Sequence, residues 1–216
     1  MGNDSVLAPL AGKSSPLFFV AAGLMAIVTG LFAAEVFLDR GMETLLGIFA
    51  PAGFGIAFLG LLGLYSTLVD RAPWSARVGA IALVIGVIGT LVLVVGHAGE
   101  LAGLYAEAPA WVAAANLLLL GGVVLGFGAF GVGVLRTGTQ SRPAGLLLLW
   151  PTVVFGGLII VVGTFILNAS FPHWVHVGHS ASEAVVYLSL GYLIRSGEPA
   201  TDRAQSTQAR EGTADD

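Results

Sequence analysis

The residues best suited to chemistry form a histidine-rich stretch at the start of the last apolar segment. His173, His176 and His179 are spaced three residues apart, and Glu183 follows four residues after the last of them. At 100° per residue, His176, His179 and Glu183 lie within about 60° of one another on a helix. Tyr187 continues the same line one turn further on. The spacing predicts a polar seam along one helix face.

Three further polar groups fall at the ends of other apolar segments. His97 ends one segment and is followed three residues later by Glu100, while Glu35 lies near the end of the first. If the segments alternate in direction across a membrane, these groups and the seam all reach the same side of it. We therefore treat Glu35, Glu100 and Tyr187 as members of the polar seam.

Two kinds of cofactor site fit these residue types. A divalent metal such as zinc or copper would bind His97 together with His176 or His179, and with Glu183 or Glu100, because imidazole and carboxylate groups suit such ions. Alternatively, two of these histidines on different helices would ligate a b-type haem, as in an electron-transfer subunit.

A transport role and a purely interfacial role also fit. Glu183 would be the titrating group of a proton path in a small proton-coupled transporter, since acids inside membrane spans commonly serve such paths. However, histidine and tryptophan are also at home at the membrane interface, where Trp111 and Trp174 are expected at the level of the histidines.

The composition predicts that lipid surrounds most of the chain. Of its 216 residues, 56% are hydrophobic and only 10% are charged, and the mean hydropathy is +0.90. Soluble domains carry about 25% charged residues. There are no cysteines, which excludes disulfides and thiolate sites, and no basic cluster indicates nucleic acid binding.

The apolar segments predict an all-α fold, a bundle of six transmembrane helices. A bilayer core of ~30 Å needs ~20 apolar residues. The last segment reaches that length only if it begins near residue 175, which places His176, His179 and Glu183 within or at the edge of the membrane. The six predicted spans are 17–38, 44–69, 77–98, 110–135, 144–168 and 175–194, inside a transmembrane domain of residues 16–195.

The basic residues set the orientation. With six alternating spans, eight of the nine lysines and arginines fall on one side and only Arg40 falls on the other. The positive-inside rule then places both termini in the cytoplasm. The polar ends, residues 1–15 and 196–216, are predicted to be disordered and cytoplasmic.

Small residues four apart recur within the spans, as at Ala26/Gly30, Gly53/Ala57, Ala82/Gly86, Gly122/Gly126 and Ala129/Gly133. Such pairs allow close helix crossings, either within the bundle or with a second copy or another membrane partner. Taken together, the sequence predicts a multi-pass plasma membrane protein, a non-enzymatic component with an outward-facing histidine and glutamate site. Metal or haem binding and proton-coupled transport are the alternatives.

Overall fold

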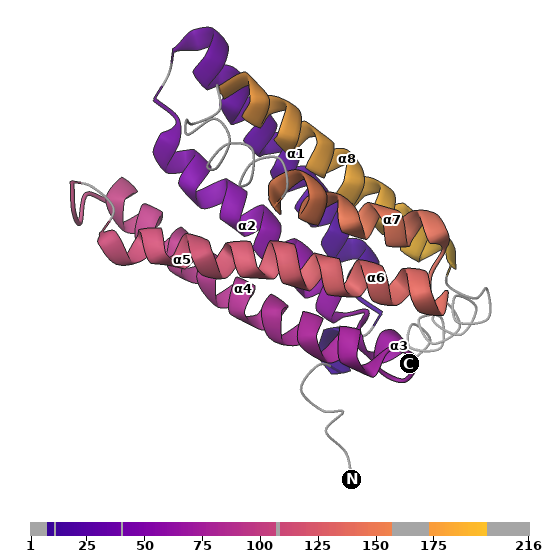
Figure 1. The fold of residues 1–216 in the computed structure, drawn as a ribbon. Helices are drawn as coiled ribbons and strands as arrows, with labels where there is room; N and C mark the ends of the chain where they lie inside the picture. Colours follow the sequence, from indigo (N-terminus) through magenta and orange to yellow (C-terminus); the bar gives the residue numbers. More distant parts are fainter. Residues whose placement is uncertain (1–7, 11, 40, 107–108, 157–172, 198–216) are drawn as a thin grey trace, which may run out of the picture.

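The protein is a bundle of helices in the computed structural model, which describes residues 8–10, 12–39, 41–106, 109–156 and 173–197 (Figure 1). Two short helices, η1 (Ala8–Leu10) and α3 (Tyr65–Val69), lie at one end of the bundle. The longer elements are α1 (Ser14–Leu38), α2 (Glu43–Leu62), α4 (Pro73–Leu101), α5 (Ala110–Gly121), η2 (Gly122–Phe127), α6 (Gly128–Thr137), α7 (Arg142–Pro151) and α8 (His173–Gly197).

Among the residues that the structure describes, four helices are long and apolar enough to cross a membrane. They are Ser14–Leu38, Glu43–Leu62, Pro73–Leu101 and the continuous helix Ala110–Thr137, which comprises α5, η2 and α6. This confirms the predicted all-α class, and the length and apolar composition of these helices fit a membrane protein. The apolar helix that begins with α7 is described only as Arg142–Gly156, and α8 carries three histidines and Glu183 and is not among the four. The predicted span 144–168 lies partly outside the described residues.

The helices pack in a closed ring. α1 lies along α8 and also contacts α2, which packs against α4. α4 then packs against α5, η2 and α6, and α7 bridges α6 to α8. Figure 1 shows α7 beside α8, with α4 and α5 on the opposite side of the bundle from α8. This arrangement gives α8 one face toward the centre of the ring.

The two ends of the bundle differ in charge. The N-terminal end of α1 and the C-terminal end of α8 lie at the same end (Figure 1). We call this the basic end, because Lys13, Arg71, Arg77, Arg136, Arg142 and Arg195 lie in or beside the helix termini that meet there. The opposite, acidic end carries Glu35, Asp39, Glu43 and Glu100.

One predicted span is interrupted in the structure. The segment predicted as a single span 44–69 is divided, because α2 ends at Leu62 and the chain turns at Gly63 before α3. A Cβ atom at Gly63 would lie 2.4 Å from the Ser14 Oγ atom and 2.7 Å from the Leu10 carbonyl oxygen. The start of α1 therefore packs directly against the end of α2, and only glycine fits between them.

Close packing inside the ring uses several of the predicted small residues. A Cβ atom at Gly86 of α4 would lie 2.9 Å from the Gly122 Cα atom and 2.7 Å from the Phe58 ring. The two glycines thus bring the backbones of α4 and η2 into contact. In contrast, Ala26 and Gly30 are exposed on the outside of α1, and a Cβ atom at Gly30 would meet nothing within 4 Å.

The helix from Ala110 to Thr137 contains a wide π turn at η2. Such turns leave backbone carbonyls less well paired than those of an α-helix. The Thr152 hydroxyl, which follows α7, lies 3.3 Å from the carbonyl oxygens of both Val123 and Val124 and donates to them. This contact ties α7 to the middle of the preceding span.

Candidate functional site

The centre of the candidate site is Glu183, in the middle of α8. Its side chain is completely buried, with 0% of its surface exposed. Neither carboxyl oxygen has a hydrogen-bond partner among the residues that the structure describes. A buried acid normally has a cation or several donors beside it, because burying a polar group without partners is costly. Glu183 is thus the least compensated polar group on α8.

Two interhelical hydrogen bonds fix the rotation of α8 against α1. The Ser15 hydroxyl donates to the Gly191 carbonyl oxygen at 2.8 Å. The Thr29 hydroxyl lies 3.1 Å from the Ser180 hydroxyl, one turn nearer the acidic end than Glu183. With α8 held in this rotation, Ser180, Glu183, Val186, Tyr187, Leu190 and Ile194 form its buried face.

Tyr187 lies one turn from Glu183 on that face and is equally buried, with 0% exposed. Its ring stacks on Phe127 at a centroid distance of 6.0 Å and packs against Phe18 at 6.1 Å. The hydroxyl is near enough to interact electrostatically with the Glu183 carboxyl. The two groups lie close enough for a side-chain rotation to join them by a hydrogen bond. In the conformation described, the distance and angle of that bond are not met, and the hydroxyl has no other partner in the described part of the chain.

Two of the three histidines of α8, His176 and His179, continue the line toward the acidic end. The His179 ring lies 5.5 Å from the Phe155 ring, and its Nδ1 atom is buried without a hydrogen-bond partner among the described residues. The His176 ring stacks on Phe32 of α1 at 5.3 Å. The predicted seam of His176, His179, Glu183 and Tyr187 therefore exists as one face of α8; only the backbone of His173 is described.

His97 and Glu100 form a separate cluster between α4 and α2. The His97 Nδ1 atom lies 3.2 Å from a Glu100 carboxyl oxygen, and the other oxygen lies 3.5 Å from the Thr44 hydroxyl. The His97 ring occupies the space above Gly47, where a Cβ atom would be 2.5 Å from it. Both side chains are about one-quarter exposed. The pair lies near the C-terminal end of α4, which is at the acidic end of the bundle.

Glu35 has a local structural role. Its carboxyl accepts a hydrogen bond of 2.7 Å from the backbone N–H of Met42, the residue that precedes α2. The first N–H groups of a helix lack partners within the helix, so a carboxylate there stabilises the helix start. Glu35 therefore closes the turn between α1 and α2.

The geometry bears directly on the metal hypothesis. Across the described residues, no group of three or more His, Cys, Asp or Glu side chains is close enough to hold a metal ion. His97 packs on α2, whereas His176 packs on α1 and His179 on Phe155. The four residues predicted as ligands, His97, His176, His179 and Glu183, are thus divided between two clusters.

Comparison of the chain with known proteins gives no further guide. No family model, no curated protein and no solved structure matches it.

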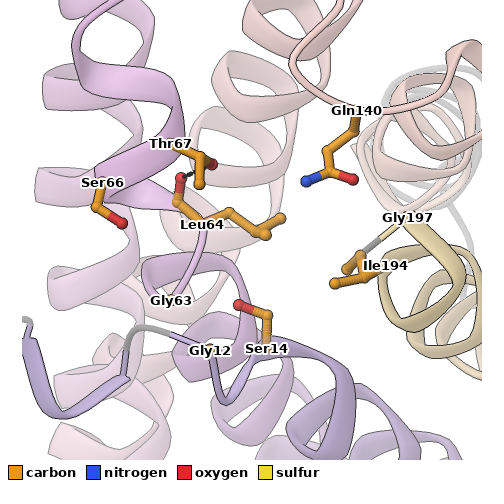
Figure 2. Close-up of a pocket in the computed structure, with 9 residues that line it drawn as sticks. All are labelled: Gly12, Ser14, Gly63, Leu64, Ser66, Thr67, Gln140, Ile194 and Gly197. Atoms are coloured by element: carbon orange, nitrogen blue, oxygen red, sulfur yellow. Dashed lines mark hydrogen bonds between the residues drawn. The ribbon is translucent and has the colours of Figure 1, made fainter. Parts of the chain in front are cut away.

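One part of the molecule escaped the sequence reasoning, a cavity at the basic end (Figure 2). It has a volume of about 210 Å³ and is lined by Ser14, Leu64, Gln140 and Ile194, among others. Ser14 and Gln140 are ordinary residues for a helix start and a loop. Because the cavity forms only where four segments meet, no local sequence pattern could have revealed it.

Proposed function

We propose that this is a six-span protein of the plasma membrane that conducts or exchanges protons through Glu183. The observation that carries the proposal is the completely buried carboxyl group whose two oxygens have no partner among the described residues. An acid that serves only structure would be expected to pair with a cation or with donors. An acid that binds and releases a proton has to leave its oxygens available.

The charge difference between the bundle ends supports an orientation for this pathway. Under the positive-inside rule the basic end faces the cytoplasm, with both termini on that side. The acidic end, with His176 and the His97–Glu100 pair, then faces outward. The helix that begins with α7 supplies the described part of the fifth span, and α8 supplies the sixth.

The row of groups on α8 supports a route for the proton. In our proposal, a protonated His179 imidazole releases its proton to the Glu183 carboxylate, which becomes the neutral acid. The Tyr187 hydroxyl, the next polar group toward the basic end, then accepts a hydrogen bond from that acid once a side chain rotates. A proton-conducting protein of this kind is one specific form of the non-enzymatic membrane component that the sequence predicts.

Metal and haem binding receive less support from the same residues. The side chains that would share a metal ion are divided between two clusters. A haem with two histidine ligands needs opposing imidazoles with free nitrogens on either side of the ring. The His97 ring faces Gly47 of α2, and the His176 ring faces Phe32 of α1.

The proposal can be tested with purified protein in liposomes that contain a pH-sensitive dye. After a pH jump outside, wild-type protein should collapse the proton gradient faster than protein-free liposomes do. Glu183→Gln, which keeps the size of the side chain, should reduce the rate to the protein-free level. Glu43→Gln is the matched control, because Glu43 is an exposed acid at the start of α2.

The competing structural role gives a different result in the same samples. If Glu183 only holds the bundle together, Glu183→Gln should lower the yield and the thermal stability of the purified protein. Equal proton flux in wild type and Glu183→Gln, with both well folded, would refute the proposed function.

A further inference from the structure

The cavity at the basic end lies where four segments converge. The start of α1, the turn after α2, the loop between α6 and α7 and the end of α8 all contribute to it. Figure 2 shows Leu64, Gln140 and Ile194 surrounding the same open space, with Ser14 at its edge. The lining residues within the described part of the chain are uncharged, and several are polar.

Ser14 is a polar residue at the wall of this space. Its side chain is only 3% exposed, yet its hydroxyl has no hydrogen-bond partner among the described residues. In Figure 2 the hydroxyl rises from α1 beside Gly63, at the wall of the cavity. Buried hydroxyls are nearly always paired with protein groups or ordered water.

The cavity and Glu183 lie on the same face of one helix. Ile194, which lines the cavity, is eleven residues beyond Glu183, or about 16 Å along the helix axis. Tyr187 and Leu190 lie between them on the buried face, and both have 0% of their surface exposed. Phe18 of α1, also completely buried, packs against the Tyr187 ring. An apolar layer of Phe18 and Leu190 therefore separates the cavity from the Tyr187 hydroxyl and Glu183.

We infer that the cavity is a water-filled vestibule through which Glu183 exchanges protons with the basic side of the membrane, and that Phe18 and Leu190 form the barrier that closes it in this conformation. The inference rests on the proposed function of Glu183, and its ligands are water and the hydrated proton. Polar groups lie on both sides of the barrier. The vestibule would open toward Glu183 when the barrier side chains move apart.

The absence of cysteine from the sequence makes the vestibule directly testable. Ser14→Cys is introduced into the full chain, reconstituted in liposomes and exposed to a small, charged thiol reagent that does not cross membranes. The cysteine should react when the reagent is on the side of the basic end and not from the opposite side. Ala21→Cys, at a completely buried position of α1, is the matched control and should not react from either side.

A second position guards against misfolding of the first variant. Ile194→Cys also lines the cavity and should react from the same side as Ser14→Cys. Failure of both cysteines to react in folded protein, or reaction at the rate of Ala21→Cys, would overturn the vestibule.

The barrier is tested separately by proton flux. Leu190→Ala should raise the flux above that of wild type, and adding Glu183→Gln to Leu190→Ala should remove the increase. Leu188→Ala is the matched control, because Leu188 is on the same helix but 54% exposed on its outer face. An equal leak in Leu190→Ala with and without Glu183→Gln would overturn the barrier while leaving the proposed function intact. Conversely, reactive vestibule cysteines combined with unchanged flux in Glu183→Gln alone would refute only the function.

Discussion

Glu183 and Tyr187 lie one turn apart on the buried face of α8, both fully removed from solvent, and none of their three side-chain oxygens has a hydrogen-bond partner among the described residues. Burying such groups without partners lowers stability. Natural proteins keep destabilising arrangements mainly where function needs them. The pair is therefore the strongest functional signal in the bundle.

The first prediction concerns stability at this site. Glu183→Met, which keeps the length of the side chain, should raise the free energy of unfolding by about 1–3 kcal/mol, because it removes an unpaired buried carboxyl. Thermal unfolding of the detergent-solubilised protein measures the change. Tyr187→Phe should shift the unfolding temperature in the same direction by less. A marked loss of stability in Glu183→Met would mean that the carboxyl is paired in the folded protein.

The contact between α4 and η2 gives the second prediction. Gly86→Ala should destabilise the protein by about 1–3 kcal/mol, because the added methyl group overlaps Gly122 and Phe58. Gly30→Ala is the control, since a Cβ atom there meets nothing within 4 Å. That variant should be neutral or more stable by about 0.5–1 kcal/mol through its higher helix propensity. Equal effects of the two substitutions on unfolding would contradict the described packing.

A third prediction concerns the cluster at the acidic end. Gly47→Ala should destabilise the protein by about 1–3 kcal/mol, because its Cβ atom would overlap the His97 ring. The loss should largely disappear in the His97→Ala background, where the ring is absent. A double-mutant cycle on unfolding free energies measures this coupling. Additive effects would show that His97 does not occupy the space above Gly47.

Cofactor content provides the fourth prediction. Because the candidate ligands are divided between two clusters, we expect the purified protein to lack a Soret absorption band and stoichiometric zinc, copper or iron. Absorption spectroscopy and elemental analysis of the same sample provide the measurement. A Soret band that vanishes in His97→Ala or His176→Ala would instead establish the haem alternative.

The seam on α8 could be predicted from the sequence because it depends on a single helix. Residues 176, 179, 183 and 187 share a face in any α-helix, and the length of the apolar segment required Glu183 to lie inside it. The sequence also predicts which side of α8 faces the bundle, because an acid is costly in contact with lipid and Glu183 must therefore point inward.

The relation between His97 and the α8 histidines could not be predicted, because it depends on which helices are neighbours. Sequence places His97 at the end of its helix but does not reveal that its ring faces α2. Likewise, the early end of α2 reflects the contact of Gly63 with Ser14, two residues 49 positions apart. Such contacts arise only when the helices assemble.

The π turn at η2 changes the rotational register of the helix that contains it. A turn of this kind accommodates one residue more than regular α-helix, which offsets everything beyond it by about 100°. Phe127, the last residue of the π turn, is completely buried and stacks on the Tyr187 ring. Straightening η2 into ordinary α-helix would swing Phe127 away from Tyr187 and deprive the proposed proton route of one of its walls.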